Sequence, residues 1–424
     1  MDGHAVIVGA QLRAAREAAG VSLSVVAGEL HRGKSAVAYY ETGKRAAPPD
    51  VIAWYEKRFG GLADPVASLA DLGKADVERR AFLRSGYSTA LSASMVLPGS
   101  LERSGPVVRS VPSLRRVGAS DVEEVRQIMV FFSQIDQRRG GGHGRSAVVQ
   151  YLSEEVVAYL HGSYPDDRVR RDMFSAAAEM AYLAGWMAFD NDEHYTAQRY
   201  FGTATKLAAE ADDEPLAGHI LRAMAHQAID LGHHSDGLAL AEASVSGGRY
   251  RTATPKERSL LMVVYAKALS AANNSRAAAT ALLAAEEDLA SASDTVTEPA
   301  RVYFFSEASL AHETGCALRD SGDLRGAAAQ FEVSVRKRKA SAFARTHAVT
   351  LGYLGSIQAR QGDLEQACAT WSSALSAMGT VQSGRTRRVA RDIRATVAPH
   401  LGAAVAGVAE VHQQAAEYLA AQQI

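Results

Sequence analysis

Apolar residues recur every three or four positions along most of the chain. In the N-terminal region they form two stripes, Leu12, Ala15, Ala19 and Val26, Ala27, Leu30. A further run at the same spacing comprises Val122, Val125, Ile128, Met129 and Phe132. Such spacing places apolar side chains on one face of an α-helix. The pattern predicts an all-α fold.

Two stretches near the C-terminus, residues 310–335 and 350–375, repeat one another at an offset of forty residues. The first has Gly315, Leu318, Gly322, Asp323, Leu324, Ala327 and Phe331. The second has Gly355, Gly362, Asp363, Leu364, Ala367, Trp371 and Ala374. Small residues, a Gly-Asp turn and a large aromatic residue in this order are typical of two helices that cross closely.

Each part of the repeat has a predicted place in such a helix pair. Gly315 and Gly355 are small where the first helix must let the second approach, and the Gly-Asp pairs turn the chain. Ala327 and Ala367 lie at the crossing, and an aromatic side chain, Phe331 in the first copy, fills the space beside it. A single pair cannot bury its apolar face, so at least about three pairs must stack.

Three weaker copies precede these two. They comprise Gly185, Ala188, Ala197, Phe201, Ala204; then Ala225, Ala228, Gly232, Gly237, Ala241; then Ala266, Leu269, Ala278, Leu282 and Ala285. About five units would then occupy residues 179–378, with an insertion around Ala290 to Glu298. The stretch resembles tetratricopeptide (TPR) repeats, and this resemblance implies a TPR-like α-solenoid.

Residues 9–48 combine the signals of three short helices. Gly20 ends the first helix, Ser22 caps the second, and His31–Gly33 makes a tight turn before the third. The residues that carry a family resemblance are Gly9, Leu12, Arg13, Arg16, Gly20, Ser22, Ala27, Leu30, Ser35, Val37, Glu41, Gly43 and Arg45. Residues 1–60 resemble an XRE/Cro-type helix-turn-helix domain, in which the third helix enters the major groove of DNA.

The resemblance assigns DNA-binding roles to individual residues. Those placed at base edges are Lys34, Ser35, Ala38 and Tyr39. Those placed at phosphates are Arg13, Arg16, Ser22, Lys44 and Arg45. Two positions depart from the family pattern, because Leu23 stands where a glutamine is usual and Gly33 where a serine is usual. The alternative interpretation is that residues 1–60, the head of the chain, form a degenerate domain that has lost its affinity for DNA.

Charge and composition limit the classes of function. The chain of 424 residues has a formal charge of −1, so any contact with DNA must be local. Within residues 1–60, eight Lys and Arg stand against six Asp and Glu. The two cysteines, Cys316 and Cys368, favour a reduced, cytoplasmic protein. We expect no membrane association, because neither a signal peptide nor a run of about twenty apolar residues is evident.

Residues 61–120 are predicted to be a linker with short helices, because Gly, Ser and Pro interrupt them. Within it, Arg79-Arg80-Ala81-Phe82-Leu83 is similar to a twin-arginine export motif. Its position after a folded module favours an ordinary helix with a basic face. Residues 121–178 are predicted to be a helical lead-in to the solenoid. The stretch 138–145, rich in glycine and arginine, is favoured as an interhelical loop over a phosphate-binding loop.

A candidate ligand site follows from the solenoid. The first helices of successive units line the concave side, so residues on one face of these helices converge on a groove. They include Tyr182, Trp186, Phe189, Arg222, His226, Lys267, His312, Arg319 and Arg360. A cation can pair with a peptide carboxylate while the aromatic residues bind an apolar side chain. The alternative is that these are ordinary polar residues in pairs such as Arg222–Asp230 and Arg319–Asp320.

Residues 379–424 are predicted to be capping helices. Their basic start has Arg385, Arg387, Arg388, Arg391 and Arg394. For these arginines a solvated face is favoured over an extended DNA track. His233–His234 has no partner at metal-ligand spacing, and neither a catalytic constellation nor a nucleotide loop is evident. We therefore predict no metal, no cofactor and no enzyme activity.

A DNA-reading head before a TPR body is similar to actinobacterial XRE-type regulators and to the RRNPP class of peptide-responsive regulators. This resemblance implies a cytoplasmic, homodimeric transcription factor that binds a double-stranded DNA operator. It also implies a peptide or other small-molecule effector, often an exported and re-imported peptide as in quorum sensing. The rival interpretation is a TPR adaptor that binds a partner protein and has a head without DNA affinity.

Overall fold

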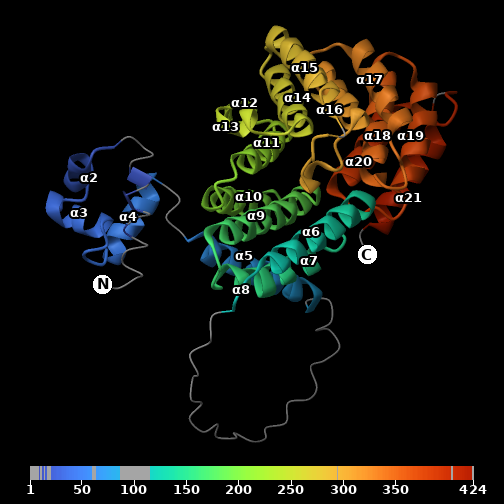
Figure 1. Ribbon diagram of the computed structural model, residues 1–424. Coiled ribbons are helices and arrows are strands. Elements are labelled where there is room, and N and C mark those ends of the chain that lie inside the picture. Colours follow the sequence, from blue (N-terminus) through green and yellow to red (C-terminus); the bar gives the residue numbers. More distant parts are fainter. Residues whose placement is uncertain are drawn as a thin grey trace, which may run out of the picture. The chain divides into compact units, whose positions relative to one another are not determined.

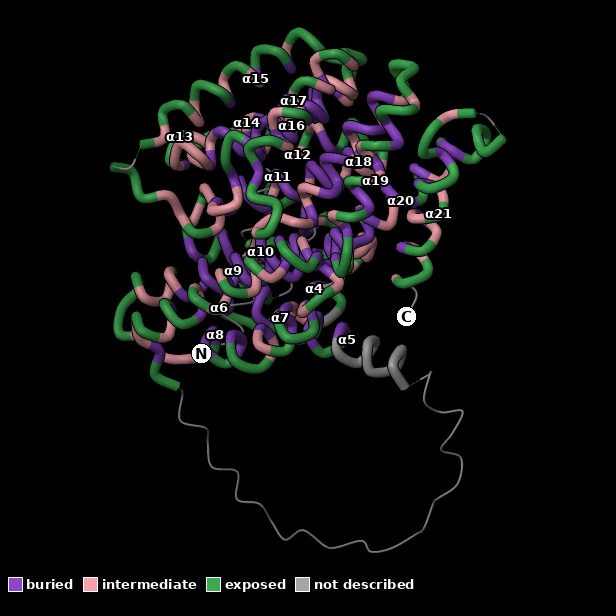
Figure 2. Tube along the Cα trace, turned by 90° about the vertical axis from the view of Figure 1, so that its right-hand side faces the viewer, coloured by how far each residue is buried: buried purple, intermediate pink, exposed green. Residues whose placement is uncertain are grey.

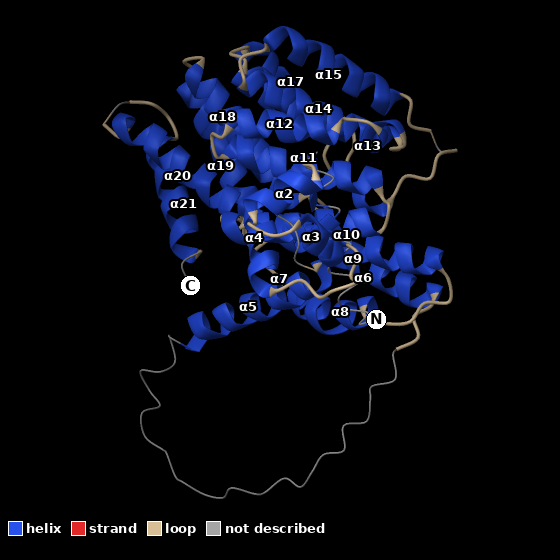
Figure 3. Ribbon diagram, turned by 90° about the vertical axis from the view of Figure 1, so that its left-hand side faces the viewer, coloured by secondary structure: helices blue, strands red, loops and turns tan. Residues whose placement is uncertain are grey.

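A computed structural model describes residues 9, 12–13, 15–16, 21–59, 64–85, 115–293, 295–402 and 404–422, without the side chains of residues 49, 53, 56–57 and 77–85. The chain divides into two compact units, residues 1–68 and 69–424. Their helices are labelled in Figure 1. No strand occurs among these residues (Figure 3), so the predicted all-α fold is confirmed.

The N-terminal unit is built from short helices around an apolar core. Its complete helices are α2 (Leu23–Glu29), α3 (Lys34–Glu41) and α4 (Pro49–Phe59). Ser22 caps α2, as predicted, by accepting a hydrogen bond from the Val25 amide at 3.4 Å. The core consists of Leu12, Val26, Ala27, Val37, Tyr40, Val51 and Tyr55. The predicted apolar positions Leu12, Ala15, Val26, Ala27 and Leu30 therefore pack together here, whereas Ala19 and Gly20 lie outside the described residues.

The second unit begins within the predicted linker. Helix α5 (Pro65–Ser85) carries Asp76, whose Oδ2 lies 2.6 Å from Nη2 of the buried Arg145. This part of the predicted linker therefore packs into the second unit. The Arg79–Leu83 stretch is also in α5, but its side chains, like residues 86–114, lie outside the described residues. The next elements are α6 (Ala119–Arg139), α7 (Arg145–Tyr151), the π-helical turn η1 (Leu152–Val156) and α8 (Val157–Leu160).

Consecutive pairs of helices make up the body of the second unit (Figure 1). They are α9 (Asp167–Asp190) with α10 (His194–Glu210), α11 (Glu214–Asp230) with α12 (His234–Ser244), α14 (Pro255–Ala271) with α15 (Ser275–Ala290), α16 (Glu307–Asp320) with α17 (Leu324–Lys337), and α18 (Ala344–Arg360) with α19 (Leu364–Met378). The connections contain α13 (Gly248–Arg251) and η2 (Ala300–Val302). Helices α9, α11, α14 and α16 pack on one another in succession, so the arrangement is solenoid-like.

The helix pairs approach most closely where the sequence has its small residues. A Cβ atom added to Gly315 would lie 2.7 Å from the ring of Phe331, and one added to Gly355 would lie 2.5 Å from Nε1 of Trp371. Both aromatic side chains are fully buried. Trp371 also donates a hydrogen bond from Nε1 to the Gly352 carbonyl at 3.1 Å. The predicted close approach is confirmed at both glycines.

The turns inside the pairs share a local conformation. The residues that adopt a positive φ there are Asp192, Gly232, Asn273, Gly322 and Gly362. Glycine, aspartate and asparagine tolerate this conformation better than other residues do. Asp323 and Asp363 then cap α17 and α19, because their side chains accept the Gly326 and Gln366 amides at 2.9 and 3.0 Å. The predicted Gly-Asp turns are confirmed.

The two ends of the helical body meet each other. Helices α20 (Gly384–Val397) and α21 (Val408–Ala421), with η3 (Ala398–His400) between them, follow the last pair. Ser383, directly before α20, donates a hydrogen bond to Asp190 at the end of α9 at 3.0 Å. Helix α6 joins the same ends, because its Asp136 lies 2.8 Å from Arg345 of α18. Helices α6 and α20 therefore cover the first helices of the pairs, α9, α11, α14 and α16, which we call the inner helices. Figure 2 shows many buried residues on the inner helices, whereas α15 is largely exposed.

The glycine-rich loop after α6 takes part in this closure. The Gly141 amide donates to Asp190 Oδ2 at 2.8 Å, and the Gly142 amide donates to the Gln382 carbonyl at 2.9 Å. The loop thus joins α6 to α9 and to the start of α20, in agreement with the interhelical loop that the sequence favours. None of the helices in the described ranges is long and apolar enough to cross a membrane.

Candidate functional site

The outer face of α3 is the first candidate site. The residues predicted to point outward are Lys34, Ser35, Ala38 and Tyr39. Lys34 and Ser35 are exposed, Ala38 is half-buried, and Tyr39 keeps 49% of its surface accessible. The opposite face of the helix is anchored in the core by Val37 and Tyr40. The helix therefore presents a polar face and is held from behind by its apolar residues.

Ion pairs neutralise three acidic side chains of this unit. They are Glu29–Arg58 at 3.1 Å, Asp50–Arg32 at 2.7 Å and Glu41–Arg16 at 2.7 Å. Lys34, Lys44 and Arg45 are exposed and make no ion pair with any residue that the structure describes. The Lys44 ammonium lies 5.9 Å from the centre of the Tyr39 ring. The excess positive charge therefore gathers on α3 and on the loop that follows it.

Arg16 is a buried structural residue and not the phosphate contact that the resemblance assigns. Its Nε and Nη2 donate to the two carboxylate oxygens of Glu41 at 2.7 and 2.8 Å. Tyr55 donates to the same carboxylate at 2.8 Å. Burial, and then the Glu41 carboxylate, raise the pKa of Tyr55, so its hydroxyl remains a donor. The Arg16 guanidinium is therefore engaged inside the domain and is not presented to DNA.

Both departures from the family pattern have a local consequence in the structure. Leu23 is half-buried and packs against the core, so it adds apolar contact where a polar residue would reach outward. Gly33 is the N-cap of α3 and leaves the first amides of that helix without a side-chain acceptor. Arg13 and Ser22 are exposed, although the Ser22 hydroxyl also caps α2.

Residues 7–54 match the family model of a helix-turn-helix domain. The N-terminal unit is a helix-turn-helix domain. The presence of this domain supports the interpretation of the protein as a DNA-binding regulator. Helix α3 is the helix that follows the turn of the motif. No curated protein and no solved structure is similar enough to the chain to count as a match.

The second candidate site lies outside the helix-turn-helix domain, on the inner helices of the second unit. Seven predicted ligand residues meet there, namely Tyr182, Trp186, Phe189, Arg222, His226, Lys267 and His312. The ring centres of Trp186 and His226 are 5.9 Å apart, as are those of Phe189 and His226. Lys267 Nζ lies 3.3 Å from His226 Nε2. The predicted convergence of the first helices therefore holds for these residues.

Two other predicted ligand residues lie apart from this cluster. Arg319 forms the Arg319–Asp320 pair at 2.8 Å, and its guanidinium lies 5.1 Å from the centre of the Tyr353 ring. This confirms the ordinary ion pair that the sequence left as an alternative. Arg360 is exposed at the end of α18.

Lys267 is the centre of a buried ionic network. Its Nζ lies 3.1 Å from Asp230 and 4.0 Å from Glu313. Burial alone would raise the pKa of both carboxyls, but Lys267 and His226 lower the pKa of Asp230 and bring that of Glu313 to about 2. Burial, and then the Lys267 charge, lower the pKa of His226. The cation on α14 is therefore already neutralised from within the protein.

Arg222 is not paired with Asp230, which is bound to Lys267 instead. Its Nη2 donates to the Tyr182 hydroxyl at 2.8 Å and lies 3.2 Å from His219 Nε2. Burial, and then the Arg222 charge, lower the pKa of His219 well below its ordinary value, so a neutral imidazole faces the guanidinium. Among the residues described, no carboxylate pairs with Arg222. It is a buried cation held only by neutral groups.

Sequence reasoning missed that Arg385 reaches this cluster. The predicted solvated face does not hold for Arg385, because α20 folds back over the end of α9. Its guanidinium carbon lies 4.8 Å from the ring centres of Trp186 and Phe189, and its Nε lies 3.6 Å from Asp190. The arginine-rich start of α20 was the available signal, but helical spacing does not show which neighbour will cover that helix.

Arg338 and Arg345 also reach the cluster and were not predicted. Arg345 Nη1 lies 2.8 Å from Asp136 and 3.5 Å from Asp190. Arg338, directly after α17, donates to the Ala308 carbonyl at 2.7 Å. Burial raises the pKa of Asp136 to about 6, although Arg345 opposes this shift. Neither arginine belongs to the residues that recur in the repeats, so the repeat pattern gave no reason to select them.

A cavity of about 50 Å³ lies among these side chains. Its charged walls are Arg222, Glu313, Arg338, Arg345 and Arg385. A second cavity of about 30 Å³ shares Gln137, Trp186 and Phe304 with it. About 10–15 Å³ of such space holds one water molecule, so these spaces fit a few waters or one small group. A peptide would enter only if the covering helices moved.

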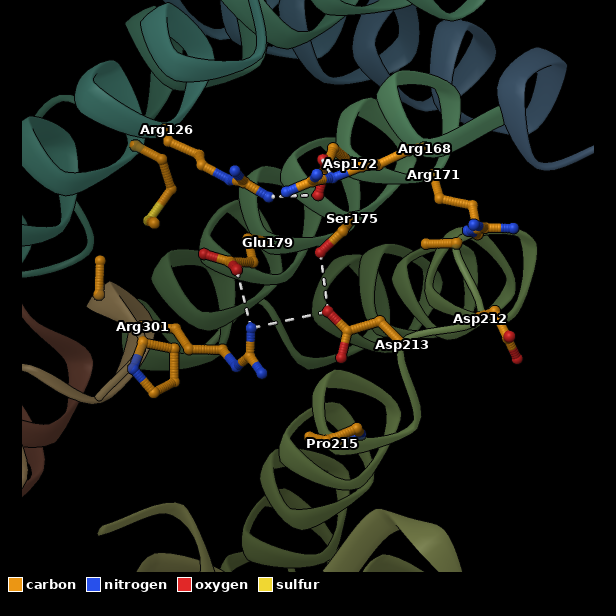
Figure 4. Close-up of a pocket in the computed structure, with 14 residues that line it drawn as sticks. Arg126, Arg168, Arg171, Asp172, Ser175, Glu179, Asp212, Asp213, Pro215 and Arg301 are labelled. Carbon is orange, nitrogen blue, oxygen red and sulfur yellow. Dashed lines mark hydrogen bonds and ion pairs between the residues drawn. The ribbon is translucent and has the colours of Figure 1, made fainter. Parts of the chain in front are cut away.

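A larger pocket of about 420 Å³ is lined by residues of α6, α9, α11 and η2 (Figure 4). Its charged walls are Arg126, Arg168, Arg171, Arg301, Asp172, Glu179, Asp212 and Asp213. Arg301 lies 3.0 Å from Glu179 and 3.7 Å from Asp213, and Arg126 lies 3.1 Å from Asp172. Cations and carboxylates are equal in number, so this pocket has no excess charge with which to select an ion.

Proposed function

We propose that the protein is a transcriptional regulator that binds a double-stranded DNA operator through α3 and whose second unit binds an effector that changes operator affinity. The observation that supports this most is the exposed, basic face of α3 in a domain that matches the helix-turn-helix family model. The acidic groups nearby are paired with arginines, so a chain with almost no net charge still offers DNA a positive surface.

The proposed DNA contacts divide by chemistry. Lys34 can donate to a guanine edge, and Tyr39 can contact a thymine methyl group. Ser35 and Ala38 lie on the same helix face and complete the surface toward the bases. Lys44, Arg45, Arg13 and Ser22 are proposed to contact phosphates, which fix the register of the domain on DNA without reading sequence.

We further propose that the protein acts as a homodimer. Helix-turn-helix proteins commonly bind two half-sites about 34–36 Å apart, which mirrors the two-fold symmetry of the protein. The operator would then be an inverted repeat. An effector that changes the separation of two heads would change how well they match the half-sites.

The effector is proposed to act at the inner helices of the second unit, which we interpret as TPR-like. Aromatic and basic side chains from α9, α11, α14 and α16 meet there. The same space is covered by α6 and α20. An effector that binds more tightly when this cover is displaced would shift the population toward the open form. A peptide is compatible with this mechanism only in that open form.

Selection of bound DNA from a random pool by the full-length protein tests the proposal. We expect one enriched inverted repeat, which the double variant Lys34→Ala, Tyr39→Ala fails to enrich. Arg276→Ala, an exposed residue of α15, serves as the control and should enrich the same sequence. A pool that stays unenriched with the wild-type protein would favour the adaptor.

The adaptor remains the second candidate, because Leu23 and Gly33 stand where the family pattern usually has a glutamine and a serine. It would bind a partner protein through the second unit. Titration of genomic fragments at moderate and high salt separates the two functions. A regulator retains a few sites as salt rises, whereas an adaptor shows only weak binding that salt abolishes.

A further inference from the structure

We propose that the cavity between Arg222, Arg338 and Arg385 is a binding site for a small organic carboxylate. The inference depends on the proposed function only for its regulatory consequence, because binding of the anion requires no DNA. It concerns the chemistry of the effector, and it adds Arg338 and Arg385, which the repeat pattern does not contain, to the predicted Arg222. Charge, hydrogen bonding and volume each support it.

Buried positive charge exceeds buried negative charge around this cavity. The buried or nearly buried cations are Arg222, Lys267, Arg338, Arg345 and Arg385. The carboxylates that face them are Asp136, Asp190, Asp230 and Glu313. Asp230 and Glu313 lie close to Lys267 and neutralise it. Asp136 and Asp190 lie close to Arg345 and Arg385 and neutralise these two cations. Five cations against four carboxylates leave one positive charge, which a monoanion would neutralise.

The remaining charge is located on Arg222 and Arg338. Only 2% of Arg222 and 8% of Arg338 is exposed. Arg222 is bound by Tyr182 and His219, and Arg338 by Ser334 and the Ala308 carbonyl, all of them neutral groups. Burial lowers the pKa of Arg338 to about 10 against the opposing effect of Glu313. A buried cation without a counter-charge is costly, so these two side chains favour an anion between them.

Hydrogen-bond donors on three arginines also lack acceptors. They are Nε of Arg222, Nε of Arg338, and Nε and Nη2 of Arg385, for which no described residue provides a hydrogen-bond acceptor. Water could accept these bonds but would not balance the charge. A carboxylate does both, because its two oxygens match the forked geometry of a guanidinium.

The size and walls of the cavity limit the anion further. A volume of about 50 Å³ fits a carboxylate group. The adjoining space of about 30 Å³ shares Trp186 and Phe304 with this cavity and is also lined by Asp136, Glu179 and Arg301, so it is large enough for only a short tail. A monoanion matches the single excess charge better than a phosphate dianion does. The proposed ligand is therefore a carboxylate with a short tail, either a free acid that fits the closed cavity or, once the covering helices have moved, the C-terminus of a peptide.

Thermal unfolding and calorimetric titration of the full-length protein test this site. The probes are sodium acetate, propionate and inorganic phosphate at equal ionic strength with chloride as reference, and one tetrapeptide with a free or an amidated C-terminus. The variants are Arg222→Gln and Arg222→Lys, with Arg360→Gln as a control at an exposed position of the same charge. Arg222→Lys keeps the positive charge but loses the two parallel N–H donors of the guanidinium. It therefore remains informative if Arg222→Gln fails to fold.

We expect a carboxylate to raise the melting temperature of the wild type and of Arg360→Gln beyond the effect of chloride. Its affinity should fall by about tenfold or more in Arg222→Gln and by less in Arg222→Lys. Binding of acetate or propionate identifies a free acid as the source. Binding of only the tetrapeptide with a free C-terminus identifies a peptide as the source, and either result supports the site.

Three results would overturn the proposal. They are no binding of any carboxylate, equal binding to wild type and Arg222→Gln, and binding of phosphate alone. The DNA function is tested separately, by adding the bound carboxylate to an operator titration. A carboxylate that binds at Arg222 without changing operator affinity would leave the site intact and refute its regulatory role.

Discussion

Arg16 illustrates how one buried residue can be mistaken for a surface contact. Its position matches an arginine that the family resemblance places near phosphates. The structure instead packs it against Glu41 and Tyr55, where the ion pair fixes α3 to the first helix. Sequence spacing gives the helix but not the partner of a charged side chain, because that partner is 25 residues away.

Replacing Glu41 by Gln should destabilise the helix-turn-helix domain. The change removes the Glu41 carboxylate from the buried Arg16, and breaking a buried ion pair costs about 3–5 kcal/mol. Chemical denaturation followed by Trp54 fluorescence measures it, provided that Trp186 and Trp371 are replaced by phenylalanine in every variant. Asp50→Asn breaks the exposed pair with Arg32 and should cost less than about 1 kcal/mol. Equal effects of the two changes would contradict the structural role of Glu41.

His312 should make the second unit less stable in mild acid. Burial lowers the pKa of its imidazole from 6.5 to about 3, and its Nδ1 lies 2.8 Å from the Thr350 hydroxyl. As the pH falls, the unfolded chain takes up the proton first. The stabilisation is therefore complete above the unfolded pKa and is lost as the pH falls toward the folded one.

Denaturation between pH 7 and pH 5 measures this loss. The contribution of His312 should approach about 1.4 kcal/mol for each pH unit below the unfolded pKa. His312→Asn should make the pH dependence less steep by the share of this one imidazole, since the buried His219 and His226 also have a lowered pKa. His234→Asn, at the exposed first position of α12, should leave the slope unchanged. An unchanged slope in His312→Asn would show that this imidazole is not the group responsible.

At the scale of the elements, contacts inside each repeat set how the two helices of that repeat cross. The small residue on the first helix and the aromatic residue on the second were visible in the sequence, and Gly355 and Trp371 meet as expected. These positions could be predicted because both lie in one unit, joined by a short turn. The cover formed by α6 and α20 could not, because it depends on contacts such as Asp136–Arg345, 209 residues apart.

Gly355→Ala should destabilise the second unit. The new Cβ would lie 2.5 Å from Nε1 of the buried Trp371, and overpacking of this kind costs about 1–3 kcal/mol. Gly202→Ala is the matched control, because Gly202 lies inside α10 with no atom within 4 Å of the new Cβ. It should stabilise α10 by about 0.5–1 kcal/mol. Denaturation midpoints of the full-length variants test both the expected loss and the expected gain of stability. An unchanged midpoint in Gly355→Ala would contradict the tight crossing of the two helices.

At the scale of the whole chain, the N-terminal domain offers the exposed basic face of α3, and the second unit encloses a charged interior. Asp190 is central to the enclosure, because it accepts the Gly141 amide and the Ser383 hydroxyl and lies near Arg345 and Arg385. Its carboxylate therefore joins the loop after α6, the end of α9 and the start of α20. Any effector that reaches the inner helices must compete with these contacts.

Asp190→Asn should loosen this closure while the helix pairs remain folded. Amide hydrogen exchange should accelerate at Gly141 and in the first turn of α20, because their shared carboxylate is lost. Asp236→Asn, an exposed residue of α12, should leave exchange in these segments unchanged. Equal protection of Gly141 in wild type and Asp190→Asn would show that Asp190 does not hold the cover in place.

Operator recognition by α3 is tested most directly by a titration of the full-length protein against its enriched DNA site and a scrambled site, at two salt concentrations. The wild type should prefer the enriched site by about a thousandfold or more. Lys34→Ala, Tyr39→Ala should lose most of that preference and keep weak, salt-sensitive binding. An unchanged preference in the double variant, or no preference in the wild type, would contradict the proposed role of α3.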